Sequence, residues 1–254
     1  MSVAPLTDFL LVIPAFRESG RLPPYLDALK HTLAPAGFTT SILVVDDGSP
    51  PPEQAALSTL IRPGSTGTCT VVAPLLLTVN QRKGGAILAG WRHRPASRWL
   101  AFVDADGAIP AREVLRVFTL VAAGSQPSTA YFSSRQRSAG RVVEQRPLRF
   151  LAGRIFAGLV RLLVDRKIHD SQCGFKIVPA ALFARIDSSL HGHGFCFDVE
   201  LLASLRQAGG EVREIPIDWK EQPGGKITPF RHGPRMLLDL WKIRRRSGCT
   251  PPTA

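Results

Sequence analysis

Residues 99–110 read WLAFVDADGAIP, an apolar run that ends in two aspartates separated by one alanine. Such a run is typical of a strand buried on both faces of a parallel sheet. If the strand extends through Asp104 and Asp106, both carboxylates point to the same face and repel each other. A divalent cation removes the conflict because hard cations prefer carboxylate oxygens. Taken alone, the pattern also fits two solvated aspartates in a turn. The residues at the ends of the other expected strands are needed to choose between a cation site and a turn.

Three further apolar runs alternate with helix-like segments in the first half of the chain. This alternation predicts an α/β fold with a mostly parallel central sheet and helices on both faces. In such folds ligands bind at the carboxyl ends of the strands. The expected strands are residues 8–14, 41–45, 70–79 and 99–103, and the expected helices are residues 21–33, 52–61 and 83–92.

The second half of the chain is mixed and has no clear boundary with the first. We expect one domain over residues 1–254, with a nucleotide-binding half to about residue 107 and an acceptor half over about 108–254. Here the expected strands are residues 130–134, 168–178 and 211–219, and the expected helices are residues 146–164, 198–207 and 234–246.

The formal net charge of +12 comes mostly from arginine and indicates an anionic partner, although a GC-rich genome also raises arginine content. The four cysteines lack CxxC or zinc-site spacing, so reduced cytoplasmic thiols are expected. No stretch has the length and apolarity of a membrane span, and no signal-peptide pattern is present. The expected protein is cytoplasmic, either soluble or peripheral on the membrane face.

Two other expected strands also end in polar residues. In VVDDGS, Asp46 and Asp47 could accept hydrogen bonds from a nucleobase or a ribose, while an Asx-turn before the next helix is the alternative. In PAFRE, Phe16 and Glu18 could frame a base, while a glutamate at a helix N-terminus is the alternative. Three acidic strand ends together favour a ligand site with a cation over isolated turns.

Residues 80–90 read NQRKGGAILAG and open an expected helix. Its two glycines allow close backbone approach, and the helix N-terminus together with Lys83 attracts phosphate. The pattern is neither GxGxxG nor a Walker A loop, so dinucleotide oxidoreductases and P-loop enzymes are disfavoured.

In this order and spacing, PAFRE, VVDDGS, NQRKGGAILAG and DADGA resemble family 2 glycosyltransferases of the GT-A fold. The second half of the chain resembles the dolichyl-phosphate β-glucosyltransferases and, more loosely, the polyprenyl-phosphate mannose synthases. The resemblance covers about residues 8–246. The motifs that carry it are SSR at 133–135, QR at 145–146, DSQCGFK at 170–176, FDVELL at 197–202 and GGKI at 224–227.

The resemblance implies a single GT-A domain that moves a hexose with inversion at the anomeric carbon. The implied donor is a nucleotide sugar, UDP-glucose, and the implied acceptor is a polyprenyl or dolichyl phosphate at a membrane surface. The implied cofactor is Mg²⁺ or Mn²⁺. Phe16 stands where the family usually has tyrosine, which removes one hydroxyl contact.

The resemblance also assigns roles by position to most of the candidate residues, while the roles of Asp47, Lys83, Lys176 and Asp198 come from the residues themselves. The nucleotide-sugar site would contain Pro14, Phe16, Glu18, Asp46, Asp47, Lys83, Asp104 and Lys226, and the metal ligands would be Asp104 and Asp106. The acceptor phosphate would contact Arg135, Arg146 and Lys176, and the catalytic set would be Asp106, Arg135, Arg146 and Asp198. For Lys176, a solvated lysine at a strand end is the alternative.

The acceptor decides whether a general base is needed. A phosphomonoester is already anionic near neutral pH, so positioning and stabilisation of the leaving diphosphate suffice. A hydroxyl acceptor needs a base, for which Asp170 and Asp198 are the candidates. The alternative functions are therefore a family 2 transferase acting on a soluble hydroxyl acceptor and, more remotely, a sugar-phosphate nucleotidyltransferase. A nucleic-acid-binding module needs no acidic strand ends and would show an aromatic platform, which this sequence lacks.

Residues 146–164 read RPLRFLAGRIFAGLVRLLV and place four arginines on one broad helical face. Apolar residues fill the other face, as in interfacial helices on anionic lipid and also in ordinary amphipathic core helices. The basic stretch at residues 241–246 would add electrostatic attraction to such a surface. We expect peripheral membrane contact through these segments.

Overall fold

The computed structural model describes residues 7–93, 97–124, 126–136, 140–192, 196–223 and 229–247 of the 254 residues. At residues 148, 149, 152, 229–235 and 247 the description is limited to the backbone. The predicted donor-site residue Lys226 lies outside the described residues.

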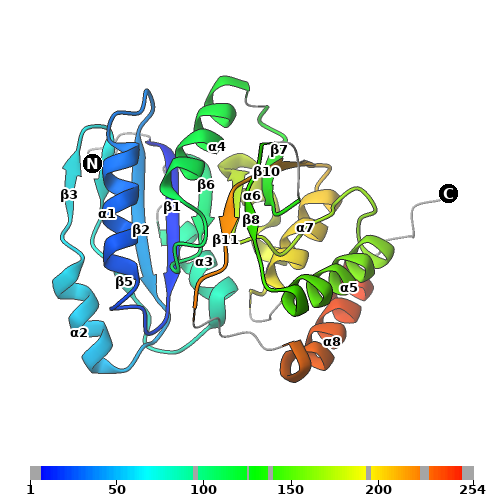
Figure 1. Cartoon of the computed structure of the whole chain (residues 1–254). Helices are drawn as coiled ribbons and strands as arrows, with labels where there is room; N and C mark the ends of the chain where they lie inside the picture. Colours follow the sequence, from blue (N-terminus) through cyan, green and yellow to red (C-terminus); the bar gives the residue numbers. More distant parts are fainter. Residues whose placement is uncertain are drawn as a thin grey trace.

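A large sheet forms the centre of the described chain, with strand order β10-β7-β9-β6-β1-β2-β4-β3 and with β5 pairing beside β4 on β2 (Figure 1). A separate two-stranded sheet joins β8 and β11. The strands are β1 (Thr7–Ala15), β2 (Thr40–Asp46), β3 (Gly64–Thr66), β4 (Cys69–Val71), β5 (Leu75–Leu76), β6 (Ser97–Val103), β7 (Thr129–Ser134), β8 (Val143–Glu144), β9 (Phe175–Pro179), β10 (Glu211–Pro216) and β11 (Trp219–Lys220).

The pairing within the sheet is mostly parallel, which confirms the predicted fold class. β1 pairs in parallel with β2 on one side and with β6 on the other, so the carboxyl ends of these three strands meet at one edge. β9 runs antiparallel between β6 and β7. β9 starts directly after the DSQCG segment, and its first residue, Phe175, pairs with Val103 at the end of β6.

Helices cover both faces of the sheet (Figure 1). Side chains of α1, α2 and α4 join one core with alternate residues of β1, while α3, α5, α6, α7 and α8 contribute to a second core with the intervening residues of β1. The helices are α1 (Leu22–Leu33), α2 (Pro51–Leu60), α3 (Arg82–His93), α4 (Ala111–Gly124), α5 (Pro147–Leu163), α6 (Ala180–Ile186), the 3₁₀ turn η1 (Asp187–Ser189), α7 (Phe197–Gln207) and α8 (Pro229–Ser247).

Three predicted strands differ from the structure. Residues 70–79 hold two short strands, β4 and β5, because Pro74 has no N–H for a ladder hydrogen bond. The predicted strand 168–178 is confined to β9, and residues 168–174 form turns instead. The predicted strand 211–219 divides into β10 and β11 after Pro216.

Two helices, α4 and α6, were not predicted. The sequence does carry a signal for α4, since Val114, Val117, Phe118 and Val121 recur at helical spacing and are all buried. Helix α6 has only seven residues and follows β9 directly, which leaves too few turns for a periodic pattern.

The buried cysteines provide a test of this packing. Burial raises the pKa of Cys69 to about 11 and the pKa values of Cys173 and Cys196 to about 12, so almost no thiolate forms at pH 8. We expect iodoacetamide at pH 8 to leave these three thiols unmodified in the folded protein and to modify all of them after denaturation. Peptide mapping by mass spectrometry checks this, and rapid labelling of native Cys173 would contradict the packing.

Candidate active site

The residues predicted for the nucleotide sugar follow the three parallel strands β2, β1 and β6 at their common carboxyl edge. Ala15 at the end of β1 is the register partner of Asp46 at the end of β2, and its carbonyl accepts a hydrogen bond from the Asp47 N–H at 2.8 Å. Asp104 and Asp106 come directly after β6, on the other side of β1. The fold therefore brings the predicted acids to one edge.

Asp47 holds the segment that leads into α3. Its Oδ1 accepts a hydrogen bond from the Gln81 N–H at 2.7 Å, and its carbonyl accepts one from Asn80 Nδ2 at 2.9 Å. Gly48 has φ +67°, and a Cβ there would lie 2.7 Å from the Asn80 nitrogen. Burial raises the pKa of Asp47 despite these hydrogen bonds. The described contacts of Asp47 thus support the start of the helix that carries Lys83.

Asp46 does not have the accessible position that the predicted contact with a base requires. Its side chain is fully buried, and Oδ2 accepts hydrogen bonds from the Ser49 N–H at 2.9 Å and from Gln54 Nε2 at 2.8 Å. The bond to Ser49 spans three residues, so it is a local side-chain bond before α2 that differs from the two-residue Asx-turn left as the alternative. Its other oxygen, Oδ1, is also buried and has no hydrogen-bond partner within the described residues, so a ligand could contact Asp46 only if this oxygen became accessible.

The end of β1 leads into the first turn of α1. Glu18 is buried and forms a two-pronged ion pair with Arg21, with N–O distances of 2.7 and 2.8 Å. The Glu18 carbonyl accepts hydrogen bonds from the N–H groups of Arg21 and Leu22, so the residue stabilises the helix start. Pro14 and Phe16 are only partly buried and remain accessible beside it.

Asp104 and Asp106 lie in the turn after β6, so the predicted same-face geometry of strand residues does not apply. They still influence each other: burial raises the pKa of Asp106, and the charge of Asp104 raises it further. Lys83 Nζ lies 2.8 Å from Asp104 Oδ1. Burial alone would lower the pKa of Lys83, but Asp104 and Asp198 outweigh it and raise the pKa.

Two close backbone approaches fix these groups. The Asp104 N–H donates to the Gly174 carbonyl at 3.0 Å, and a Cβ on Gly174 would lie 1.9 Å from Asp104 Oδ2. A Cβ on Gly84 would lie 2.4 Å from the Gly192 carbonyl oxygen and 2.6 Å from Phe197 Cβ. The start of α3 therefore packs against the start of α7, which brings Lys83 near Asp198.

Lys176 is not the accessible phosphate ligand, or the solvated strand-end lysine, that the sequence suggested. Its side chain is 0% exposed, and Nζ donates to Asp198 Oδ1 at 2.6 Å and to the Cys173 carbonyl at 2.7 Å. Its ammonium also lies over the rings of Phe102 and Phe132. The reason is topological, because β9 lies inside the sheet between β6 and β7 and not at an edge.

The donor set at the end of β6 fits a divalent cation. Asp104 and Asp106 offer hard carboxylate oxygens, and the Lys83 ammonium already provides a cationic partner at Asp104. Gly174 leaves the space at the Asp104 carboxylate that any other side chain would fill. Within the described ranges, no group of three or more histidines, cysteines or acids could hold a metal. Asp104 and Asp106 are therefore the two side chains here that could hold such a cation.

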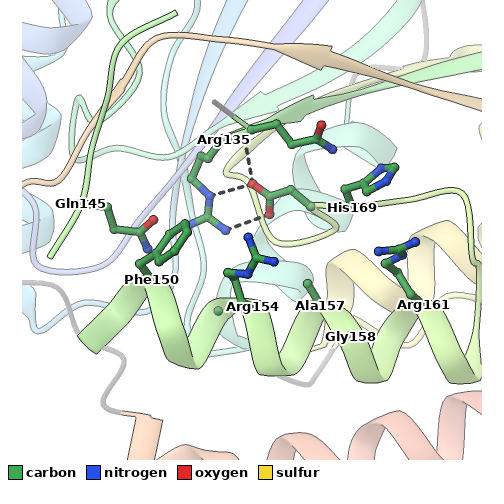
Figure 2. Close-up of a pocket in the computed structure, with 11 residues that line it drawn as sticks. Arg135, Gln145, Phe150, Arg154, Ala157, Gly158, Arg161 and His169 are labelled. Atoms are coloured by element: carbon green, nitrogen blue, oxygen red, sulfur yellow. Dashed lines mark hydrogen bonds and ion pairs between the residues drawn. The ribbon is translucent and has the colours of Figure 1, made fainter. Parts of the chain in front are cut away.

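A second site lies between the end of β7 and α5. This pocket of about 500 Å³ has cationic side chains around Asp170 (Figure 2). Arg135 binds the Asp170 carboxylate with Nε at 2.7 Å and Nη2 at 2.8 Å, and its N–H donates at 2.9 Å. The lining residues are Arg135, Gln136, Gln145, Phe150, Gly153, Arg154, Ala157, Gly158, Arg161, His169 and Asp170.

The Arg135–Asp170 ion pair keeps both groups of this pocket charged. Burial alone would raise the pKa of Asp170, but Arg135 lowers it, so the carboxylate stays ionised. Burial alone would lower the pKa of Arg135, but Asp170 and, to a smaller extent, Asp104 raise it. The two sites are joined by the short loop 170–174, because Asp170 binds Arg135 and the Gly174 carbonyl accepts the Asp104 N–H.

Arg146 does not line this pocket. Its N–H donates to Glu221 Oε2 at 2.8 Å, and its side chain lines a second hollow of about 270 Å³, together with Glu144, Gln145, Glu221, Gln222 and Pro223. The sequence analysis predicted that Arg135 and Arg146 lie side by side and bind one acceptor phosphate. The structure instead brings Arg154 toward Arg135, as Figure 2 shows.

From the sequence, the arginines of α5 were expected to lie on a face that contacts the membrane, and not in a pocket. Phe150, Arg154 and Arg161 recur at spacings of four and seven residues, which is the signal of one helical face. What the sequence could not show is that this face turns toward Asp170. His169, the other missed residue, donates its N–H to Glu214 at 2.9 Å, so β10 fixes it.

Comparison with known proteins identifies the family of this chain and its similar relatives. Residues 10–186 match the family described as Glycosyl transferase family 2. The dolichyl-phosphate β-glucosyltransferase of Homo sapiens is 31% identical over 96% of this chain and 76% of that protein, and that of Drosophila melanogaster is 30% identical over 94% and 75%. The polyprenol monophosphomannose synthase of Mycolicibacterium smegmatis is 28% identical over 88% and 82%.

Solved structures share the fold at low sequence identity. Glucosyl-3-phosphoglycerate synthase from Mycobacterium tuberculosis, solved with Mn²⁺, UDP and glucosyl-3-phosphoglycerate, superposes with a TM-score of 0.65 at 14% identity, over 97% of this chain and 82% of that chain. A mannosyltransferase from Pyrobaculum calidifontis, solved with GDP-mannose and Mn²⁺, gives 0.62 at 17%, over 98% and 68%. The acidic strand ends, the sheet order and the family match together show that the chain belongs to glycosyl transferase family 2 and has the GT-A fold.

Proposed function

We propose that the protein is an inverting transferase that moves a hexose from a nucleotide sugar, with UDP-glucose as the expected donor, to a polyprenyl-phosphate acceptor. One observation carries the choice of acceptor: the cationic pocket around Arg135 is joined to the acidic edge by the loop 170–174 and is bounded by a helix with an exposed apolar stripe. Relatives named for the same type of acceptor, at about 30% identity over most of the chain, support this choice.

On the donor side, the two aspartates after β6 would hold Mg²⁺ or Mn²⁺. When bound there, the ion would stabilise the negative charge of the leaving diphosphate. Lys83 at the start of α3 would face the phosphates of the donor, and Pro14 and Phe16 would line the site beside them. The predicted Lys226 would complete this side from beyond the described residues.

On the acceptor side, Arg135 and Arg154 would bind the phosphate. The Asp170 carboxylate fixes the Arg135 guanidinium, which reduces the conformational freedom lost when the acceptor binds. The acceptor phosphate would attack without a general base because it is already anionic near neutral pH. Asp198, the predicted base for a hydroxyl acceptor, is 4% exposed and paired with Lys176, which disfavours that alternative.

Helix α5 has three faces with different surroundings. Phe156, Leu159, Val160 and Leu163 pack on the core, while Arg154 and Arg161 face the pocket. The third face exposes Leu151, Ile155 and Leu162, and α8 exposes Leu237, Leu238 and Trp241. We propose that these side chains enter the membrane surface beside the pocket and so present the lipid phosphate to Arg135. None of the described helices is long and apolar enough to cross a membrane.

The cation site is tested by Asp106→Asn. We expect glycosyl transfer to be lost because the cation keeps only one carboxylate. The folded-state pKa of Asp106 is raised, so its ionised form destabilises the fold at every pH above that pKa and stops doing so at acidic pH. The variant should therefore melt at a higher temperature than wild type at pH 7.5, with the difference fading toward acidic pH. Calorimetry and a donor-turnover assay measure both effects.

Asp27→Asn, on the exposed face of α1, is the matched control and should change neither property. Normal turnover by Asp106→Asn at pH 7.5 would contradict the cation site.

The acceptor pocket is tested by Arg154→Ala. Loss of a charge-assisted hydrogen bond of about 1.5–3 kcal/mol should raise the KM for polyprenyl phosphate by about 10- to 100-fold and leave the Kd for the donor nucleotide unchanged. Steady-state kinetics and calorimetric nucleotide binding separate the two. Arg146→Ala, assayed alongside, shows whether the neighbouring hollow also contributes.

The control is Arg92→Ala, an exposed arginine that pairs with Asp187 at the far end of α3. If Arg154→Ala lowers donor and acceptor binding equally, the residue is structural and the pocket assignment is wrong. If wild type transfers sugar only to a soluble hydroxyl acceptor, the alternative function holds.

The membrane face is tested with the triple variant Leu151→Ser, Ile155→Ser and Leu162→Ser. Each side chain would lose about 1.5–3 kcal/mol of apolar burial in the lipid, so binding to phosphatidylcholine vesicles containing phosphatidylglycerol should fall at least about tenfold. Co-sedimentation measures it. A control with the exposed leucines Leu60 and Leu120 changed to Ser should bind like wild type. Equal loss in both variants would contradict the assigned face.

A further inference from the structure

A chain of four alternating charges crosses the site from the cation ligands to the core. Asp104 pairs with Lys83 at 2.8 Å, Lys83 Nζ lies 3.9 Å from Asp198 Oδ2, and Asp198 Oδ1 pairs with Lys176 at 2.6 Å. The Lys83 ammonium therefore lies between two carboxylates. One is a predicted cation ligand, and the other has no part in the cation site.

The two ends of this chain differ in freedom. Lys176 and Asp198 are buried, and Lys176 is held by the Cys173 carbonyl and by two aromatic rings. The side chain of Lys83 is 34% exposed and has a flexible stem. A small displacement of Lys83 toward Asp198 thus requires no movement of the buried pair.

From this geometry we infer that Asp198 is a positioning residue that offers Lys83 a second binding position. With the cation site empty of metal, the Lys83 ammonium neutralises Asp104. A divalent cation at Asp104 repels that ammonium, and Lys83 moves to Asp198 Oδ2, the oxygen that Lys176 does not use. Lys176 holds the Asp198 carboxylate in the orientation that keeps this oxygen toward Lys83.

This inference rests on the proposed cation site and gives Asp198 a role other than proton transfer. It also explains the tight packing at Gly84, because any Cβ there would push the start of α3 away from α7 and separate Lys83 from Asp198. A general base needs access to the acceptor, whereas a positioning carboxylate needs only its two lysines.

The test is a double-mutant cycle on the binding of Mn²⁺ alone, measured by the electron paramagnetic resonance signal of free Mn²⁺. Lys83→Met removes the competing ammonium and should tighten Mn²⁺ binding. Asp198→Asn keeps the volume of the side chain and an acceptor for Lys176, but confines Lys83 to Asp104, and should weaken binding about tenfold. The double variant should bind like Lys83→Met, because without Lys83 the second position is irrelevant.

Additive effects would overturn the inference, since they would mean that each charge acts only through its field. Unchanged Mn²⁺ affinity in Asp198→Asn would also overturn it. Asp165→Asn breaks a different buried ion pair, with Arg206, and should lower the melting temperature without changing Mn²⁺ affinity. If wild type binds no Mn²⁺, with or without UDP, the proposed cation site fails and the inference fails with it.

Discussion

The close contact between the Gly174 backbone and the Asp104 carboxylate sets the geometry of the whole site. The Gly174 carbonyl accepts a hydrogen bond from the Asp104 N–H. Residue 174 must be glycine, because a Cβ there would clash with Asp104 Oδ2. This contact exists because β9 runs antiparallel to β6 and meets it where β6 ends. The end of β6 and the start of β9 are therefore joined at the predicted cation ligand.

The short segment DSQCGFK serves both sides of this junction. Asp170 at its start orients Arg135 in the cationic pocket, and Gly174 packs on Asp104. Lys176 at its end pairs with Asp198 inside the sheet. One loop thus contacts both the predicted cation ligand Asp104 and the groups proposed to hold the acceptor phosphate. The electrostatic influence of Asp104 on Arg135 follows from the same proximity.

Two carboxylates of the site are each compensated by a cationic partner, which lowers the cost of taking them out of water. Asp170, which is partly buried and lines the pocket, is paired with Arg135, and the buried Asp198 is paired with Lys176. Removing one member of such a pair leaves an uncompensated charge and is far more destabilising than never having buried the pair. Lys83 is the exception, because its ammonium is shared between two carboxylates and is still partly exposed. We therefore expect the Lys83 ammonium to be able to move between Asp104 and Asp198.

The sequence by itself determined the fold class, the acidic strand ends and the family. Continuous apolar runs followed by acids require buried parallel strands, and parallel strands bring their carboxyl ends together whatever the details of packing. The helices α1, α2, α3, α5 and α7 were likewise predicted to within a few residues, since each shows apolar periodicity. The arginine-rich character of α5 was also visible, but not the direction in which its arginines face.

Only the tertiary structure decided which charges meet. Asp46 and Lys176 read as accessible ligands from the sequence, yet their strands lie within the sheet and bury them. Arg154 replaced Arg146 beside Arg135 because α5 turns that face, and not its first residue, toward Asp170. Pairing between residues far apart in the chain depends on strand order and helix rotation, and local sequence patterns carry neither.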